Sequence, residues 1–266
     1  MAGQMSLSPD GTRLAYSNPA VNDIFVLDLE SGVETRLTFE GKLVTNPVWS
    51  PDGRTLAFAR ISTSAGWDTY TKAADGTGPD AQLFKGPGLF AFPLDWSGDG
   101  RWLVDLCTDA TGNYDLWKIP MTGDGKPEVY QHTPAAESAA ALSKDGRWLL
   151  YTAFEGGTGR IFLQSFPEPG AKYQLAVPDA VGAKWGDRMD EILMIDKQGE
   201  MLAVDVNLEN GFRQGATHRL FKLAPTEFTD DFTSDHRRFL VGERKDNSAS
   251  ARLEVVMGWP QLIDGQ

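Results

Sequence analysis

Several side chains with oxygen ligands for a metal ion are widely spaced along this 266-residue chain. Asp95, Glu137 and Asp231 supply carboxylates, and Asn46 adds a neutral amide oxygen. Ca²⁺ prefers several such oxygens and accepts a flexible geometry, so these side chains would hold Ca²⁺ or another divalent cation if the fold brought them together. The competing interpretation is a solvated acidic rim, or ion pairs between these carboxylates and Lys184.

A second group of candidate metal ligands falls within one short stretch: Asp105, Asp109, Asn113 and Asp115. These residue types suit calcium, but the bidentate glutamate that closes an EF-hand loop would fall on Pro120. An aspartate also recurs just before a predicted strand at Asp23, Asp68 and Asp115. This recurrence favours a local hydrogen bond over a metal ligand at that position.

Nucleophilic catalysis has little support in the sequence. Of the three histidines, His132 lies shortly before Glu137 and is the one candidate base, around which a serine–histidine–acid triad would have to be built. The chain has no Gly-x-Ser-x-Gly elbow and no His-Glu-x-x-His motif. Its single cysteine, Cys107, excludes an internal disulfide framework and a Cys-x-x-Cys motif. A catalytic function is therefore the less favoured interpretation.

The charge balance limits the partners of this protein. A formal net charge of −12 at pH 7 and a pI near 4.7 argue against nucleic acid and anionic membranes, because both bind basic surfaces. No apolar stretch approaches the roughly 20 residues that span a bilayer. The first residues show no signal-peptide pattern, so we expect a soluble chain without an export signal of its own.

The elements that must position these residues come from an internal repeat of about 45 residues, a period typical of four-stranded propeller blades. One copy is Trp49–Phe58, with the sequence WSPDGRTLAF. Six copies align without a gap, and they begin at Leu7, Trp49, Trp96, Leu142, Trp185 and Phe232. Each copy reads as a strand, a tight turn and a second strand, and we interpret its aspartate as a cap for backbone amides of the turn. The tryptophans that begin three copies are interpreted as packing between blades.

The repeat predicts an all-β fold, a six-bladed β-propeller of four-stranded antiparallel blades. We expect residues 1–266 to form a single propeller whose blade repeats start near residues 5, 47, 94, 140, 183 and 230. The chain after Met257 is barely long enough for a fourth strand, so either the tail Trp259–Ile263 (WPQLI) supplies that strand or the last blade is incomplete. An unfinished edge favours either a monomer with a covered edge or an edge-mediated dimer, and it suggests that the chain was cut from a longer one.

The unit at Trp49–Phe58 resembles the WD40-like Pro-Asp repeat of TolB-type propellers, and the resemblance covers nearly the whole chain. Three further segments are similar to the C-terminal propeller of bacterial serine/threonine protein kinases: Gln164–Gln174 (QSFPEPGAKYQ), Arg238–Val241 (RFLV) and Glu254–Trp259 (EVVMGW). The kinase motifs themselves are absent, so the resemblance implies a sensor or protein-contact module that is not a kinase. It implies an extracytoplasmic location if the parent is a membrane-bound kinase-like protein, and a cytoplasmic one otherwise.

Propeller folds usually bind ligands at the top mouth of the central channel, where the chain enters the first strand of each blade. The predicted ligand-binding residues at this mouth are Asn46, Trp67, Phe92, Asp95, Glu137, Lys184 and Asp231. The favoured function is a non-catalytic module that binds a protein, a peptide or a small molecule there. The alternative is a metal-assisted hydrolase of esters or lactones with Asp95, Glu137 and Asp231 around the ion, similar in ligand types to lactonase-type propellers. No cofactor besides this cation is predicted.

Overall fold

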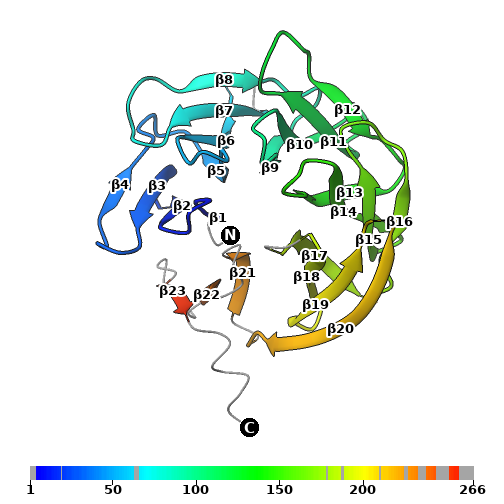
Figure 1. The fold of residues 1–266 in the computed structure, drawn as a ribbon. Helices are drawn as coiled ribbons and strands as arrows, with labels where there is room; N and C mark the ends of the chain where they lie inside the picture. The colour runs from blue at the N-terminus through cyan, green and yellow to red at the C-terminus, as the bar shows by residue number, and fades with distance from the viewer. Residues whose placement is uncertain are drawn as a thin grey trace.

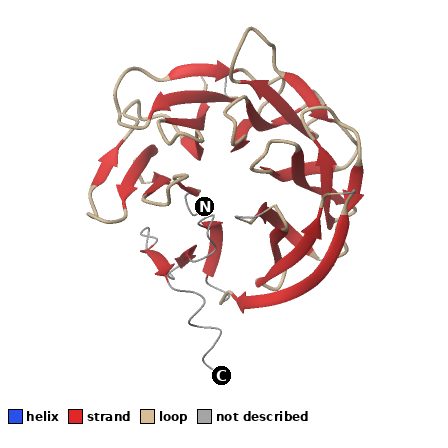
Figure 2. Ribbon diagram, in the orientation of Figure 1, coloured by secondary structure: helices blue, strands red, loops and turns tan. Residues whose placement is uncertain are grey.

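The computed structural model of the protein describes residues 4–18, 20–62, 66–177, 179–186, 189–209, 211–224, 227–232, 238–243 and 252–257, with side chains up to residue 224. Strands and the loops between them make up all of these residues (Figure 2). No helix in this part of the chain is long and apolar enough to cross a lipid bilayer. The all-β prediction is confirmed for the described residues.

Five sheets are antiparallel meanders of four consecutive strands each, and they are arranged as blades around a central axis (Figure 1). The first strand of each blade is nearest the axis and the fourth is at the periphery (Figure 1). The strands of blades 1 to 3 are β1 (Met5–Leu7), β2 (Arg13–Asn18), β3 (Asp23–Asp28), β4 (Glu34–Arg36), β5 (Val44–Trp49), β6 (Thr55–Ile61), β7 (Trp67–Ala73), β8 (Ala81–Phe84), β9 (Ala91–Trp96), β10 (Trp102–Thr108), β11 (Tyr114–Pro120) and β12 (Glu128–Gln131). Blades 4 and 5 contain β13 (Ala136–Leu142), β14 (Trp148–Glu155), β15 (Thr158–Ser165), β16 (Lys172–Gln174), β17 (Ala180–Trp185), β18 (Glu191–Asp196), β19 (Glu200–Asn207) and β20 (Arg213–Lys222).

The prediction of six four-stranded blades is wrong, because the structure has five blades of four antiparallel strands each. The sixth repeat forms a sheet of three strands, β21 (Glu227–Phe232), β22 (Arg238–Glu243) and β23 (Arg252–Met257). The repeated turn marks only the first hairpin of a unit, since its chemistry is local. The number of copies of this turn therefore does not give the number of complete blades. The fourth strand of a blade forms only if it pairs with the third strand of its own sheet.

Side-chain hydrogen bonds hold the turn between the first two strands of a blade. In blade 2, Ser50 Oγ donates to Asp52 Oδ1 over 2.6 Å, and the same aspartate oxygen accepts the backbone N–H of Arg54 at 3.0 Å. Gly53 follows with a φ of 65°, in the left-handed region that favours glycine. The serine–aspartate bond recurs at Ser8–Asp10, Ser97–Asp99 and Ser143–Asp145. The interpretation of these aspartates as turn caps is confirmed.

The ends of the blades form two faces of different construction. The turn face carries the turns that join the first strand of a blade to its second. The loop face carries the loops that join second to third strands, such as residues 109–113, and the connections into each first strand, such as residues 85–90. Any site that uses residues from several blades must lie in the channel or on one of these two faces.

Apolar side chains between neighbouring blades form the core. One cluster joins Ile24 and Leu37 of blade 1 to Leu56 and Phe58 of blade 2, and all four side chains are fully buried. Equivalent clusters join blade 2 to 3, blade 3 to 4 and blade 4 to 5. Each sheet thus hides from water the face that it could not bury alone, and this burial orders the blades relative to one another.

Two of the recurring tryptophans add hydrogen bonds between blades. The indole N–H of Trp49 donates to the backbone oxygen of Ser6 in blade 1 over 3.0 Å, and that of Trp185 donates to Ala141 in blade 4 over 3.2 Å. Trp96 differs, because its indole N–H reaches Gly100 within its own blade at 3.4 Å. The prediction that these tryptophans pack between blades is confirmed for all three, since Trp96 packs against the cluster that joins blades 2 and 3.

This difference predicts unequal effects of replacing the tryptophans. Trp49→Phe keeps a buried ring but leaves the Ser6 carbonyl without its donor, so we expect the free energy of unfolding to fall by about 1–3 kcal/mol. Trp96→Phe removes a longer bond within one blade and should cost less. Urea unfolding of both variants, followed by circular dichroism, measures the difference. Equal losses would contradict the assignment of Trp49 as a connection between blades.

Candidate functional site

A cavity of about 810 Å³ occupies the central channel. The first strands of blades 1 to 5 line it, and it extends to the turn face, where Ser8, Pro51, Gly98 and Ser143 border it. Three predicted ligand-binding residues also lie in its wall: Asn46, Asp95 and Lys184. The volume is within the range of small-molecule and peptide sites.

Backbone irregularities shape the wall of this cavity. The pairing register shifts within the first hairpin of each of blades 2 to 5, as in a β-bulge. Asn46 in β5 and Ala139 in β13 sit beside these shifts with φ values of 53° and 45°. A positive φ is unfavourable for both residue types, and most so for alanine. Because a bulge bends its strand and redirects the neighbouring side chains, these shifts set which groups face the channel.

Asp95 connects two blades. Its Oδ1 accepts the backbone N–H of Trp96 at 2.8 Å, and its Oδ2 accepts the backbone N–H of Leu142 in β13 at 2.6 Å. A carboxylate that accepts two backbone N–H groups has fewer lone pairs left for a cation. The predicted calcium site also needs Asp231, whose side chain lies outside the described residues, so this site stays a prediction.

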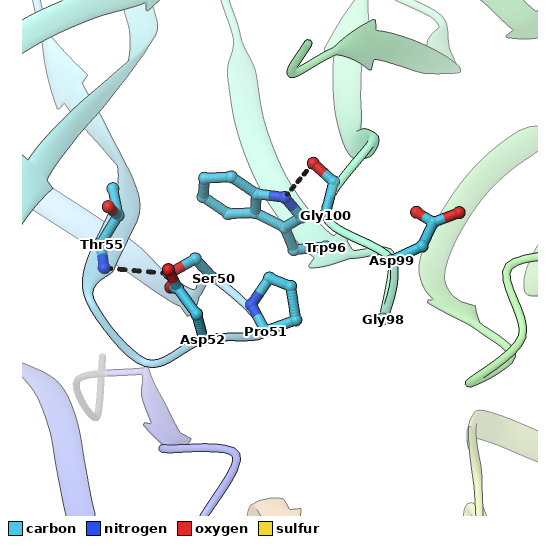
Figure 3. Close-up of a pocket in the computed structure, with 8 residues that line it drawn as sticks. All are labelled: Ser50, Pro51, Asp52, Thr55, Trp96, Gly98, Asp99 and Gly100. Carbon is cyan, nitrogen blue, oxygen red and sulfur yellow. Dashed lines mark hydrogen bonds between the residues drawn. The ribbon is translucent and has the colours of Figure 1, made fainter.

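A smaller pocket of about 440 Å³ lies between the turns of blades 2 and 3 (Figure 3). Pro51 and Trp96 provide its apolar surface. Its polar groups already have partners, since Ser50 Oγ accepts the backbone N–H of Thr55 at 2.9 Å and Trp96 donates to Gly100 (Figure 3). We therefore attribute this pocket to the packing of two adjacent turns.

The loop face carries a row of aromatic rings between blades 2 and 3. The ring centres of Trp67 and Phe92, two predicted ligand-binding residues, are 5.5 Å apart. Phe90 stacks on Phe92 at 5.4 Å and on Tyr114 at 6.3 Å. All four rings are partly exposed. The structure thus brings together one pair of residues that the sequence placed near a common site.

Exposed aliphatic side chains extend this row across blade 2. The backbone N–H of Trp67 donates to the carbonyl of Leu89 at 2.7 Å, and that of Ile61, which pairs with Trp67, donates to Leu43 at 3.0 Å. Leu89 is 61% exposed and Leu43 is 45% exposed. We name this group of neighbouring residues the loop-face strip: Leu43, Ile61, Trp67, Leu89, Phe90, Phe92 and Tyr114. Sequence reasoning missed the two leucines, although apolar residues in short connections between strands were a usable signal.

Glu137 and His132 lie on the same face but outside the strip. Glu137 is 1% exposed in β13, and its Oε1 accepts the hydroxyl of Thr133 while its Oε2 has no hydrogen-bond partner. Burial raises the pKa of Glu137 to about 7. His132 Nδ1 lies 2.9 Å from Asp115 Oδ2, and this hydrogen bond raises the pKa of His132.

The arrangement around the histidines contains no serine triad among the described residues. The hydrogen-bond partner of His132 is Asp115, and that of His218 is Asp205. His236 lies outside the described residues. Cys107 is buried, and burial raises the pKa of its thiol far above the usual range, so it is held as an unreactive thiol.

Comparison with known proteins identifies the fold. No family model matches the chain. The uncharacterized peptidase YuxL of Bacillus subtilis (strain 168) is 30% identical over 155 residues, which are 55% of this chain and 22% of YuxL. TolB from Acinetobacter baumannii has a TM-score of 0.70 at 16% identity, over 94% of this chain and 62% of that one. A second protein assigned as TolB, from Agrobacterium tumefaciens, has a TM-score of 0.68 at 15% identity, over 83% of this chain and 80% of that one. This protein therefore has the fold of a TolB-like propeller.

The raised pKa of Glu137 predicts how stability depends on pH. Between pH 4.5 and about 7 the folded chain holds a proton on Glu137 that the unfolded chain has lost, so this residue lowers stability as the pH rises. Glu137→Gln should remove that loss and raise the free energy of unfolding at pH 8 by about 2–3 kcal/mol. At pH 4 the variant and the wild type should be nearly equal.

Urea unfolding at pH 4 and pH 8 measures this effect. Glu30→Gln is the matched control, because Glu30 is exposed and its replacement should change stability little at either pH. If Glu137→Gln is less stable than the wild type at pH 8, then the ionised carboxylate of Glu137 does not destabilise the fold as we expect.

Proposed function

We propose that this propeller is a non-catalytic binding module that holds a protein or peptide segment on the loop-face strip. The observation that carries the proposal is the strip itself, in which backbone hydrogen bonds join the exposed Leu43 and Leu89 to strands β6 and β7 and the ring of Trp67 packs at a tilt against that of Phe92. A contiguous apolar surface on a soluble domain costs solvation free energy and usually marks an interaction site. Partly exposed aromatic rings are the side chains that contribute most to protein interfaces.

The chemistry of the strip and the charge of the chain describe the partner. Apolar or aromatic side chains of the partner would pack on the rings, since the strip offers few hydrogen-bonding groups. Basic residues would flank those anchors, because the chain carries a net charge of −12 and Asp109 lies beside the end of the strip at Tyr114. The partner is thus a cationic segment with apolar anchors.

The hydrolase alternative has weaker support. The name of YuxL describes a peptidase, but this chain matches 22% of that protein, and the match does not identify catalytic residues. Of the three carboxylates assigned to a catalytic ion, Asp95 is engaged by two backbone N–H groups and Glu137 is buried. The propeller fold itself is compatible with a binding module.

A sensor role within a longer protein extends the same proposal. Its support is the resemblance of Gln164–Gln174 and Glu254–Trp259 to propellers attached to bacterial protein kinases. In such a parent the module would stand outside the cytoplasm and present the loop-face strip to its partner. The reading frame upstream of this chain tests the idea directly, because a kinase domain followed by a membrane span must be encoded there.

A random peptide library selected on the immobilised protein tests the binding function. We expect the selected peptides to contain aromatic or aliphatic anchors with basic residues, and to bind less tightly at high salt. Leu89→Asp introduces a charge at the most exposed position of the strip and should weaken binding by about tenfold or more, as loss of a central contact does. Fluorescence polarisation with labelled peptides measures both effects.

Val33→Asp is the matched control for that experiment. Val33 is 60% exposed, close to the 61% of Leu89. It lies in the turn between β3 and β4 of blade 1, at the end of the blade opposite the loop face. Peptide affinity should be unchanged in this variant. Selected peptides that bind Leu89→Asp as tightly as the wild type, or that lose affinity equally in both variants, would refute the assignment of the strip.

A further inference from the structure

Three metal-ligating side chains meet on the loop face of blade 3. The ligand atoms of Asp109, Asp115 and His132 all lie within 4.8 Å of one another. Asp109 belongs to the loop after β10, Asp115 to β11, and His132 follows the end of β12. Among the residues whose side chains are described, this is the one group of three histidine, cysteine or carboxylate residues so close together.

Hydrogen bonds fix the loop that carries two of these residues. Asp109 Oδ1 accepts the backbone N–H groups of Thr111 at 2.7 Å and Asn113 at 2.9 Å and the Thr111 hydroxyl at 2.7 Å, so Oδ2 is the oxygen that Asp109 would offer to a metal ion. The side-chain amide of Asn113 then donates to the backbone oxygen of Thr133 at 2.8 Å. Because Thr133 directly follows His132, this bond ties the loop to the histidine. The three ligands are therefore held together by this loop network and by the hydrogen bond of 2.9 Å between His132 Nδ1 and Asp115 Oδ2.

A comparison between blades shows that Asp115 lacks a partner that its counterpart has. Asp23 begins the third strand of blade 1, where its Oδ1 accepts the hydroxyl of Thr38 at 2.7 Å and its Oδ2 pairs with Arg36. Asp115 uses Oδ2 toward His132, but its Oδ1 has no hydrogen-bond partner although the side chain is only 5% exposed. A buried carboxylate oxygen without a donor costs free energy, which a bound cation would recover.

The local charge also favours a cation. No lysine or arginine among the described residues is in ion-pair contact with Asp109, Asp115 or Glu137. Glu137 leaves Oε2 without a partner and acts electrostatically on both Asp115 and His132. The site thus gathers carboxylates around a single imidazole, and the lysine that acts electrostatically on Glu137, Lys172, makes no ion-pair contact with Asp109 or Asp115.

We propose that Asp109, Asp115 and His132 bind a transition-metal dication, with Zn²⁺ as the model ion and water in the remaining coordination position. Imidazole together with carboxylates suits zinc and its neighbours better than calcium, which takes oxygen ligands. Three protein ligands and an open position are an established zinc arrangement. This site on the loop face is separate from the cation predicted in the channel.

The distances allow such an ion without rebuilding the fold. Ligand atoms about 2.1 Å from a tetrahedral zinc ion are about 3.4 Å apart. The present separations include 2.9 Å between His132 Nδ1 and Asp115 Oδ2 and do not exceed 4.8 Å, so the ligand atoms must shift by up to about 1.4 Å to surround an ion. His132 can supply that movement, because its side chain is 64% exposed and can rotate.

Isothermal titration of tag-free protein with ZnCl₂ tests the site, and the visible absorption spectrum of bound Co²⁺ reports a histidine–carboxylate environment. We expect one ion per chain for the wild type. His132→Gln and Asp109→Asn each remove a ligand while leaving the buried Asp115 in place. Each should weaken binding about 10- to 100-fold or more, since even residues that only orient a ligand have effects of that size.

His218→Gln is the matched control. His218 Nε2 lies 3.2 Å from Asp205 Oδ2 on blade 5, and the described residues place no third ligand beside this pair. Zinc affinity should be unchanged in this variant. Zn²⁺ should also raise the melting temperature of the wild type and of His218→Gln, but not that of His132→Gln, because a ligand stabilises only a fold that binds it.

Several outcomes would overturn the proposal. If the wild type does not bind Zn²⁺, the proposed site does not exist. If His132→Gln binds Zn²⁺ with unchanged affinity, His132 is not a ligand. If His218→Gln loses Zn²⁺ binding, the ion binds near His218 and not at the proposed site. Binding of Ca²⁺ in preference to Zn²⁺ contradicts the imidazole ligand.

The melting temperatures of the metal-free variants are the folding control. If they match that of the wild type, a lower zinc affinity is not caused by a loss of folding.

Discussion

Burial of apolar side chains between neighbouring blades is the interaction on which the rest of this structure depends. A four-stranded antiparallel sheet has two faces and cannot hide either of them within itself. Radial packing solves this problem, since Leu56 and Phe58 of one blade meet Ile24 and Leu37 of the next at a fully buried contact. The first strands then converge on the axis and the two ends of every blade are left as faces. Sites for ligands arise only where this packing ends.

The two faces differ in how completely their polar groups are satisfied. On the turn face, the Ser50–Asp52 bond and its counterparts use the polar side chains to hold the turns themselves. On the loop face, Leu89 is exposed and the buried Asp115 and Glu137 each keep an oxygen without a partner. Unsatisfied groups and exposed apolar area are both unfavourable for an isolated fold, so they indicate where a partner or an ion contributes. These observations are the basis for our proposals of a peptide site and a metal site on the loop face.

Five of the predicted site residues divide between two places in the structure. Asn46, Asp95 and Lys184 line the channel cavity, whereas Trp67 and Phe92 meet on the loop face. Residue type alone could not separate these groups, because it does not determine which side chains of a blade face the channel. A bulge in a first strand changes which side chains face the channel, and bulges follow from pairing across the sheet.

Local chemistry made the hairpins and the blade contacts predictable from the sequence. A serine, an aspartate and a glycine at fixed spacing form the same turn wherever they occur, and Trp49 and Trp185 recur where two blades meet. The structure gives the described part of the sixth unit three strands, where the sequence had left a fourth strand open. Only the tertiary structure decided that Leu43 and Leu89 adjoin Trp67 and that His132 reaches Asp115. These outcomes depend on pairings between strands and on exposure to water. Both are properties of the assembled sheets, so no segment of the chain encodes them alone.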